Sequence, residues 1–254
     1  MKIRLYWAFT ITMMVATACG GDKQAKTDED AIVSSHQVPA GDSTIYGLAC
    51  DGCTDTILVF LRDIDSDPDT FNILAATKNH RIYGRPDIGD KVAVVRNQAD
   101  STVADIVINM ETLRGAWAYE VTPTPRPRAD MPGRSEAELL RQIPDSIRDS
   151  LMTPREYGFL IRGEGSVSFV GRYYRSDDDN SPVEFPHPKH YRQWHLYNGK
   201  LVLIETKRDS LGQEHATNSD TASFIMLTPD TLVLQFKDSR QGYYRKKDTD
   251  QTVN

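Results

Sequence analysis

The sequence predicts an all-β protein that consists of a small β-barrel followed by a larger antiparallel barrel. Short apolar or β-branched runs recur between residues 44 and 247, and Gly, Pro, Asn and Asp separate them, which is typical of closely spaced strands. Asn198-Gly199 stands between two such runs, and this pair is the strongest short signal for a hairpin. Apolar residues at helical spacing occur over residues 135–151, inside the range of the second barrel.

The N-terminus indicates export. Lys2 and Arg4 precede an apolar run over residues 5–15, and Ala16-Thr17-Ala18-Cys19 follows. Only 14 residues lie between Arg4 and Cys19, whereas a membrane-spanning helix needs about 20. We therefore expect residues 1–18 to be a signal peptide that is removed, rather than a permanent membrane span.

The same residues resemble a bacterial lipoprotein signal. This resemblance implies that the thiol of Cys19 is acylated, for example with palmitate, and that the lipid anchors the protein to a membrane. Stable anchoring takes at least two acyl chains, which a diacylated or triacylated cysteine supplies. Gly20 rather than Asp after the cysteine is compatible with sorting to the outer membrane of the bacterial cell envelope. Ala16 and Ala18 also suit ordinary signal peptidase, so plain secretion stays open as an alternative.

The charge of the exported chain argues against nucleic acid as a partner. Removal of the signal peptide takes away Lys2 and Arg4, so the formal net charge changes from −6 to −8. An acidic chain without a Lys/Arg cluster lacks the electrostatic patch that neutralises phosphates. We expect attachment to a membrane through lipid and no binding of nucleic acid.

The cysteine count fits lipidation. Three cysteines would leave one thiol unpaired in an oxidising compartment, and acylation of Cys19 leaves Cys50 and Cys53 as a pair. Asp51-Gly52 favours a turn whose ends come within about 7 Å, so we predict a structural disulfide between Cys50 and Cys53. Redox activity or metal binding by this Cys-x-x-Cys stays open, although the next run reads as a strand and not as the helix that would activate a thiolate.

The region after Cys19 divides into a tether and a first barrel. Residues 19–42 are polar and poor in large apolar side chains, which predicts a flexible tether. Residues 43–110 predict a small barrel of five or six strands. The expected strands are residues 44–49, 56–61, 71–76, 81–83, 92–96 and 103–108. Ile88-Gly89-Asp90-Lys91-Val92 enters one of them and resembles strand entries in OB-type barrels, which implies an OB-like fold.

Residues 111–247 predict the second barrel. Gly115-Ala116-Trp117 opens a strand, and this Gly-x-Trp together with the hairpins that follow resembles the lipocalins, including bacterial lipocalin-like lipoproteins. In that family the tryptophan plugs one end of an eight-stranded antiparallel barrel, and the mouth takes small apolar ligands. The expected hairpin strands are residues 191–197, 200–206, 221–227, 231–236 and 242–247. Residues 248–254 are expected to be a disordered tail.

An insertion departs from the lipocalin pattern at residues 122–155. Four prolines, at positions 123, 125, 127 and 132, predict a loop at its start. Ser135 and Glu138 form the spacing of a capping box, and the helix predicted for residues 135–151 should kink or split at Pro144. We expect its apolar stripe to cover a barrel end or the junction between the two barrels.

Large aromatic side chains are the candidates for a ligand-barrel lining. They are Trp117, Trp194, Tyr197, Phe224 and Phe236. All five could instead fill a solid core, because the interior of an eight-stranded barrel is just wide enough for side chains or for one small ligand. An apolar pocket of roughly 300 Å³ or more would favour the ligand.

No residue pattern predicts a catalytic, cofactor or metal site. His187, His190 and His195 could bind zinc or copper, but two prolines place the first two in a loop. Four aspartates at positions 63, 65, 67 and 69 do not match a calcium loop, and no hydrolase or phosphate-loop motif occurs. We expect a non-enzymatic envelope protein that binds a small apolar or amphipathic ligand. Two alternatives remain: an interaction protein with solid barrels and an envelope partner, and a thiol-redox or metal-dependent enzyme.

Overall fold

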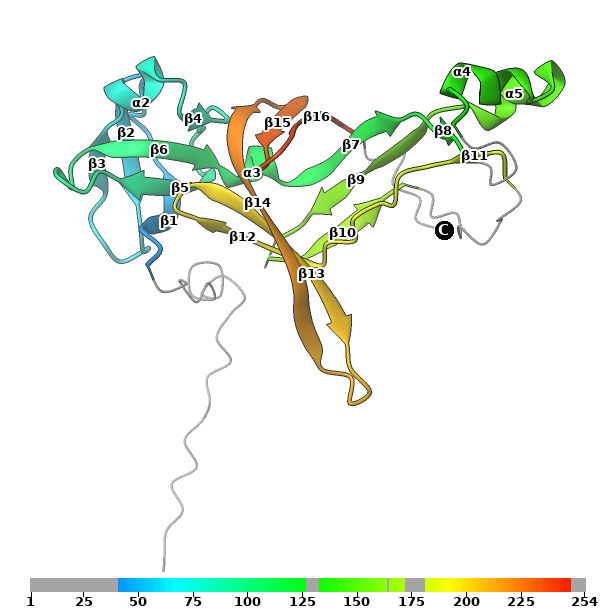
Figure 1. The fold of residues 1–254 in the computed structure, drawn as a ribbon. Coiled ribbons are helices and arrows are strands. Elements are labelled where there is room, and N and C mark those ends of the chain that lie inside the picture. Colours follow the sequence, from blue (N-terminus) through cyan, green and yellow to red (C-terminus); the bar gives the residue numbers. More distant parts are fainter. Residues whose placement is uncertain (1–40, 127–132, 164, 172–180, 248–254) are drawn as a thin grey trace, which may run out of the picture.

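The computed structural model describes residues 41–126, 133–163, 165–171 and 181–247. These residues form a six-stranded sheet, an eight-stranded sheet and a small two-stranded sheet (Figure 1). The predicted all-β fold with two successive barrels is therefore confirmed. The signal peptide, Cys19, most of the tether and the tail from residue 248 lie outside the described residues.

The six-stranded sheet belongs to the N-terminal part. Its elements are β1 (Thr44–Ala49), β2 (Ile57–Leu61), β3 (Asp69–Asn72), α2 (Leu74–Lys78), β4 (Ile82–Tyr83), β5 (Lys91–Arg96) and β6 (Ala104–Asn109). The strand order is β3-β2-β1-β5-β6-β4. The sheet curls back on itself, because the amide of Asn72 donates to the carbonyl of Thr102 (2.8 Å) and Asn72 pairs in parallel with Val103. This is the OB-like barrel that the sequence predicts.

One predicted strand in this barrel is partly wrong. The strand expected over residues 71–76 ends at Asn72, and α2 begins at Leu74. The side-chain oxygen of Asn72 accepts a hydrogen bond from the amide of Leu74 (3.0 Å), which turns the chain out of the sheet. Leu, Ala, Ala and Lys then favour a helix.

The eight-stranded sheet forms the second barrel. Its strands are β7 (Gly115–Val121), β9 (Arg155–Ile161), β10 (Val167–Val170), β12 (Gln193–Tyr197), β13 (Lys200–Arg208), β14 (Glu214–Leu227), β15 (Thr231–Gln235) and β16 (Arg240–Arg245). All neighbours are antiparallel, and the first strand, β7, pairs with the last, β16. The sheet is thus an up-and-down meander that is nearly closed, as in a lipocalin-like barrel.

Closure of the barrel depends on a short contact between β10 and β12. The amide of Val167 donates to the carbonyl of Arg192 (2.9 Å), and the amide of Trp194 donates to the carbonyl of Gly165 (2.8 Å). Ser166 and Gln193 form an isolated bridge between these bonds. The other seven strand pairs are ladders between named strands, the shortest of which joins β7 and β16 through two residue pairs. Among the described residues, β10 and β12 are joined by an isolated bridge instead of a ladder.

Trp117 plugs one end of the barrel. Its side chain is fully buried, and its indole N–H donates to the carbonyl of Leu113 (2.8 Å) in α3 (Met110–Leu113). The guanidinium of Arg245 lies 4.2 Å above the indole ring and donates to the carbonyls of Thr112, Arg114 and Pro229. This end is therefore sealed by packing and hydrogen bonds.

The first barrel has a core cluster of its own, and some of its residues also extend the hydrophobic core of the second barrel. Ala93 and Ile108 of the first barrel are buried in the same cluster as the interior of the second. The Asn198-Gly199 turn of the second barrel lies against β5 and β6, where a Cβ on Gly199 would sit 2.7 Å from Ile106. The amide of Ser43 donates to the side-chain oxygen of Asn198 (2.9 Å), which fixes the start of β1 to this turn.

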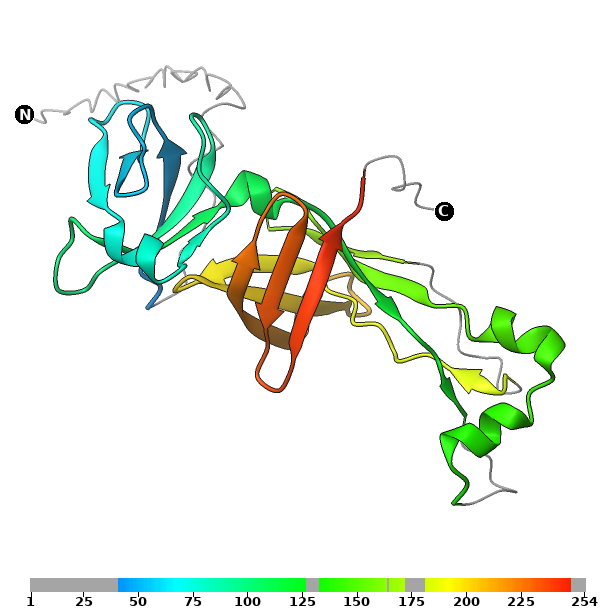
Figure 2. The same ribbon diagram turned by 90° about the horizontal axis from the view of Figure 1, so that it is seen from above.

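The insertion forms a separate arm of the second barrel. It holds β8 (Thr124–Pro125), α4 (Glu136–Arg141) and α5 (Asp145–Leu151), and β8 pairs with β11 (Val183–Glu184). Pro144 divides the predicted helix into these two, and the capping box of Ser135 and Glu138 starts α4 as predicted. Figure 2 shows the helices beside β8 at the end remote from the first barrel. Of the two places expected for their apolar stripe, a barrel end or the junction between the barrels, the junction is excluded, because α3 and the Asn198-Gly199 turn occupy it.

Candidate ligand-binding site

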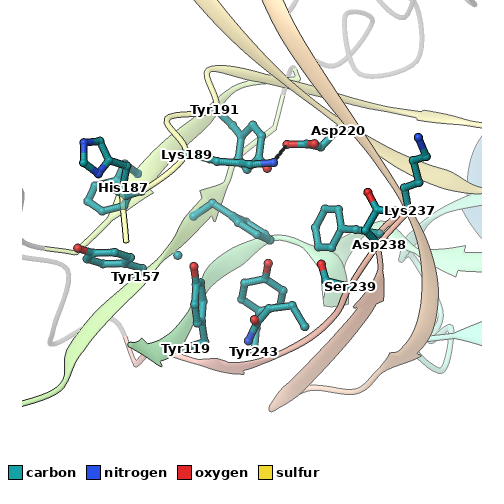
Figure 3. Close-up of a pocket in the computed structure, with 16 residues that line it drawn as sticks. Tyr119, Tyr157, His187, Lys189, Tyr191, Asp220, Lys237, Asp238, Ser239 and Tyr243 are labelled. Atoms are coloured by element: carbon teal, nitrogen blue, oxygen red, sulfur yellow. Dashed lines mark hydrogen bonds and ion pairs between the residues drawn. The ribbon is translucent and has the colours of Figure 1, made fainter. Parts of the chain in front are cut away.

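A pocket of about 300 Å³ opens at the mouth of the second barrel. It lies one layer of side chains beyond Trp117, since Tyr119 follows Trp117 on the same face of β7. Figure 3 shows its walls. They are formed by Tyr119, Tyr157, Gly158, Phe159, Phe169, His187, Pro188, Lys189, Tyr191, Asp220, Phe236, Lys237, Asp238, Ser239, Gln241 and Tyr243.

Aromatic rings make up most of the inner wall. Tyr119 and Tyr243 pack edge to face with ring centroids 5.4 Å apart, and Tyr243 also lies 5.0 Å from Phe159. Tyr157 packs edge to face on Phe169 at 5.9 Å. Because edge-to-face pairs hold one another in place, these rings form a preformed wall on which a flat apolar group can pack.

Three phenol hydroxyls in this wall have no hydrogen-bond partner among the described residues. They belong to Tyr119, Tyr157 and Tyr243, and Tyr243 is only 8% exposed. In Figure 3 the hydroxyls of Tyr119 and Tyr243 point side by side into the pocket. Burial raises the pKa of both Tyr119 and Tyr243, so both hydroxyls keep their protons at neutral pH and can donate.

Asp220 joins two other pocket residues on the opposite side. The hydroxyl of Tyr191 and the ammonium of Lys189 each donate to the same oxygen of Asp220, both at 2.6 Å. Burial alone would raise the pKa of Asp220, but hydrogen bonds from Lys189 and Tyr191 outweigh it and lower that pKa. Asp220 is therefore a carboxylate, and Lys189 is already neutralised by it.

The rest of the rim carries balanced charge. Lys237 and Asp238 are neighbours in the turn between β15 and β16, and Ser239 follows them. With Lys189 and Asp220, the lining has two cationic and two anionic side chains beside His187. The pocket therefore has no excess of either sign.

Of the five predicted lining residues, Phe236 borders the pocket and four do not. Trp117 plugs the far end, and Phe224 packs on Tyr83 of the first barrel with centroids 5.2 Å apart. Trp194 is buried at the closing seam, where its indole N–H donates to the carbonyl of Arg162 (3.0 Å). The hydroxyl of Tyr197 lies near Gly41 at the junction. Trp117, Trp194 and Phe224 fill the core and Tyr197 is half-buried at the junction, so none of the four lines the cavity.

The predicted disulfide is not formed in this structure, in which Cys50 and Cys53 are free thiols. The Sγ of Cys53 lies 3.1 Å from the carbonyl oxygen of Cys50 and accepts from the amide of Val59 (3.4 Å). This thiol is therefore held by the backbone of the β1–β2 loop, with Gly52 at a φ of 91° in the turn.

The histidines do not come together as a metal site. His190 packs on Phe169 with ring centroids 4.7 Å apart, whereas His187 lines the pocket. Burial lowers the pKa of His195, which is near Asp42 at the junction. Within the described ranges no three His, Cys, Asp or Glu side chains lie close enough to share a metal ion, and this includes the aspartates of residues 63–69.

Sequence reasoning missed the pocket tyrosines. Tyr119 stands two residues after Trp117, and Tyr157 two residues before Phe159, so each shares an inward face with a recognised or buried aromatic residue. The sequence shows this alternation. It does not show which tyrosines meet across the barrel, because that depends on the pairing of β7 with β9 and β16.

Comparison with known proteins adds one solved structure. No family model matches the chain, and no curated protein matches it. A lipocalin-like protein from Bacteroides thetaiotaomicron VPI-5482 is 19% identical and aligns over 52% of this chain and 95% of its own, with a TM-score of 0.27. In the part of the chain that the structure describes, no helix has the length and apolar character to cross a membrane.

Proposed function

We propose that this protein is a lipid-anchored, non-enzymatic protein of the bacterial cell envelope whose second barrel binds a small amphipathic ligand at its mouth. The observation that carries the proposal is the pocket of about 300 Å³ at the barrel mouth. Aromatic rings form part of its wall, and the opposite end of the barrel is sealed by Trp117. Pockets for small molecules begin at about this volume and combine apolar walls with a few polar groups. A site at the open mouth of a barrel, with a wall of aromatic rings that are already packed on one another, suits a binding protein.

Binding can be tested with N-phenyl-1-naphthylamine, an uncharged amphipathic dye whose fluorescence rises in apolar surroundings. We expect one dye to bind per chain. Gln241→Trp should abolish most of this signal, because Gln241 lines the mouth and an indole there would occupy the cavity. Gln213→Trp is the matched control, since Gln213 is exposed in the turn between β13 and β14. Equal dye binding by both variants would contradict the assignment of the pocket.

Anchoring through Cys19 is supported by the signal sequence and by the polar segment of residues 19–42 that separates it from the first barrel. The intact mass of protein extracted from membranes tests it. We expect a chain that begins at Cys19 and carries acyl groups, and a Cys19→Ser variant that leaves the membrane fraction. Unmodified wild-type protein in the soluble fraction would overturn the anchor, and with it the outer-membrane location.

One observation favours the alternative of an interaction protein. β13 and β14 continue past the barrel as a two-stranded ribbon (Figure 1), and Leu211 at its tip is 83% exposed. An exposed ribbon with unpaired edges can add strands from a partner. Cross-linking in membranes distinguishes the two functions: a partner lost in Leu211→Ser but kept in Gln241→Trp would favour interaction over ligand binding.

A further inference from the structure

The polar groups of the pocket define the kind of ligand, and this step rests on the proposed function. Two tyrosine hydroxyls lie together on the inner wall. Tyr119 and Tyr243 present hydroxyls with no partner among the described residues, whereas the carboxylate of Asp220 already accepts from Tyr191 and Lys189. Both hydroxyls reach the open pocket, so a ligand that covers them and excludes water has to supply an acceptor between them.

The charges of the lining exclude a strong preference for an ion. Lys189 is paired with Asp220 at 2.6 Å, and Lys237 and Asp238 add one charge of each sign to the rim. A carboxylate or an amine placed against the aromatic wall would lose water, which is costly, and the balanced charges of the rim favour neither sign. The ligand that fits is therefore uncharged.

The shape of the wall favours a flat ring system. The ring of Tyr243 lies 5.4 Å from that of Tyr119 and 5.0 Å from that of Phe159. The wall continues through Tyr157, whose ring packs edge to face on Tyr119 at 6.4 Å, to Phe169. Rigid rings of this kind pack best on planar groups, because offset and edge-to-face contacts are then available on several sides.

We propose that the second barrel selects uncharged aromatic carbonyl compounds, whose carbonyl oxygen accepts hydrogen bonds from Tyr119 and Tyr243. 9-Fluorenone and fluorene test this directly, since they share a flat ring system and differ in the carbonyl group. Fluorene-9-carboxylate adds the anionic case. Each compound is used to displace N-phenyl-1-naphthylamine from the purified protein.

We expect fluorenone to bind about tenfold more tightly than fluorene, because two hydrogen bonds to neutral donors contribute roughly that factor or more. In the double variant Tyr119→Phe, Tyr243→Phe the ratio should fall to within about twofold. Tyr197→Phe, which removes a hydroxyl outside the pocket, should keep the wild-type ratio. Thermal unfolding of each variant checks that the barrel is intact.

Three results would overturn the inference: equal binding of fluorenone and fluorene by the wild type, an unchanged ratio in the double variant, or tighter binding of fluorene-9-carboxylate than of fluorenone. In each of these cases the dye still binds, so ligand binding at the barrel mouth stands. If the dye itself fails to bind, the proposed function falls together with the inference.

Discussion

Arg245 and Trp117 seal one end of the barrel, where their side chains donate hydrogen bonds to backbone carbonyls. The guanidinium donates to carbonyls of Thr112, Arg114 and Pro229 and stacks 4.2 Å above the indole. A planar group with five donors suits this position, and an ammonium does not. The sealed end leaves the mouth as the route into the pocket.

Arg245→Ala should lower the free energy of unfolding by about 2 to 4 kcal/mol, because several charge-assisted hydrogen bonds and a cation–π contact are lost together. Arg245→Lys should recover less than half of this loss. Urea unfolding measures both. Arg208→Ala, at a side chain that is 74% exposed, should change stability by less than about 0.5 kcal/mol. If Arg245→Lys kept the full wild-type stability, the positive charge alone, and not the planar guanidinium, would account for the contribution of Arg245.

Asp220 should make stability depend on pH in the acid range. Its pKa in the folded protein lies below the unfolded value of about 3.9, so its contribution is complete above that value and is lost as pH falls through the folded pKa. The side chain is 22% exposed, and we expect Asp220→Asn to cost about 1 kcal/mol at pH 7. Urea unfolding at pH 7 and at about pH 2 compares the two proteins.

The difference between wild type and Asp220→Asn should narrow as pH falls through the folded pKa of Asp220, because the wild-type carboxyl then takes up a proton. Asp238→Asn on the same rim serves as the control, because Asp238 has no side-chain hydrogen bond or ion pair among the described residues. A pH-independent difference would mean that shape, and not the charge of Asp220, holds Lys189 and Tyr191.

At the scale of elements, the close approach of β7 and β9 depends on Gly158. A Cβ at this position would lie 1.9 Å from the carbonyl oxygen of Trp117 and 2.8 Å from the Cα of Ala118. Both neighbours are backbone atoms, so they move only if a strand moves. The register that places Tyr157 and Phe159 in the pocket wall is thus tied to a residue without a side chain.

Gly158→Ala should destabilise the protein by about 3 kcal/mol or prevent folding, since overpacking of backbone cannot be relieved by a rotamer change. Gly242→Ala in β16 is the matched control, because a Cβ there meets no atom within 4 Å. Thermal unfolding and yield of soluble protein measure both. Similar stability of the two variants would show that β7 and β9 can separate without loss.

Elements with one buried face were predictable from the sequence, and elements without one were not. The strand at residues 44–49 and the Asn198-Gly199 hairpin follow from alternating apolar residues and turn chemistry. The strand expected at residue 221 begins at Glu214, because the ribbon from 214 to 219 is exposed and carries no apolar alternation. The set of residues that line the pocket was not predictable, since they come from strands that are distant in sequence.

At the scale of the whole molecule, the two barrels have separate core clusters but are joined by an apolar interface. Tyr46, Tyr83 and Ile106 of the first barrel pack on the buried cluster of the second. The amide of Gly84 also donates to the carbonyl of Leu227 (3.0 Å). Because large apolar interfaces between domains couple their unfolding, we expect one cooperative transition for the wild type.

The Asn198-Gly199 turn is the position at which this coupling can be broken. Gly199 has a φ of 73°, and a Cβ on it would lie 2.7 Å from Ile106 and 3.1 Å from Val95 of the first barrel. Gly212 at the tip of the ribbon has a φ of 80°, and a Cβ on it would meet no atom within 4 Å, so Gly212→Ala introduces the same backbone strain without the contact. Comparison of Gly199→Ala with Gly212→Ala therefore separates the effect of left-handed backbone strain from the effect of contact with the first barrel.

Gly212→Ala should lower the free energy of unfolding by about 1 kcal/mol and leave a single calorimetric transition, because only left-handed backbone strain is added. Gly199→Ala should cost about 1 kcal/mol more and divide the transition in two, since the side chains of Ile106 and Val95 must shift to admit the methyl group and the docking of the turn on β5 and β6 is weakened. Differential scanning calorimetry compares the calorimetric and van't Hoff enthalpies of both. If Gly199→Ala behaves as Gly212→Ala does, the barrels are joined by other contacts and the turn does not couple them.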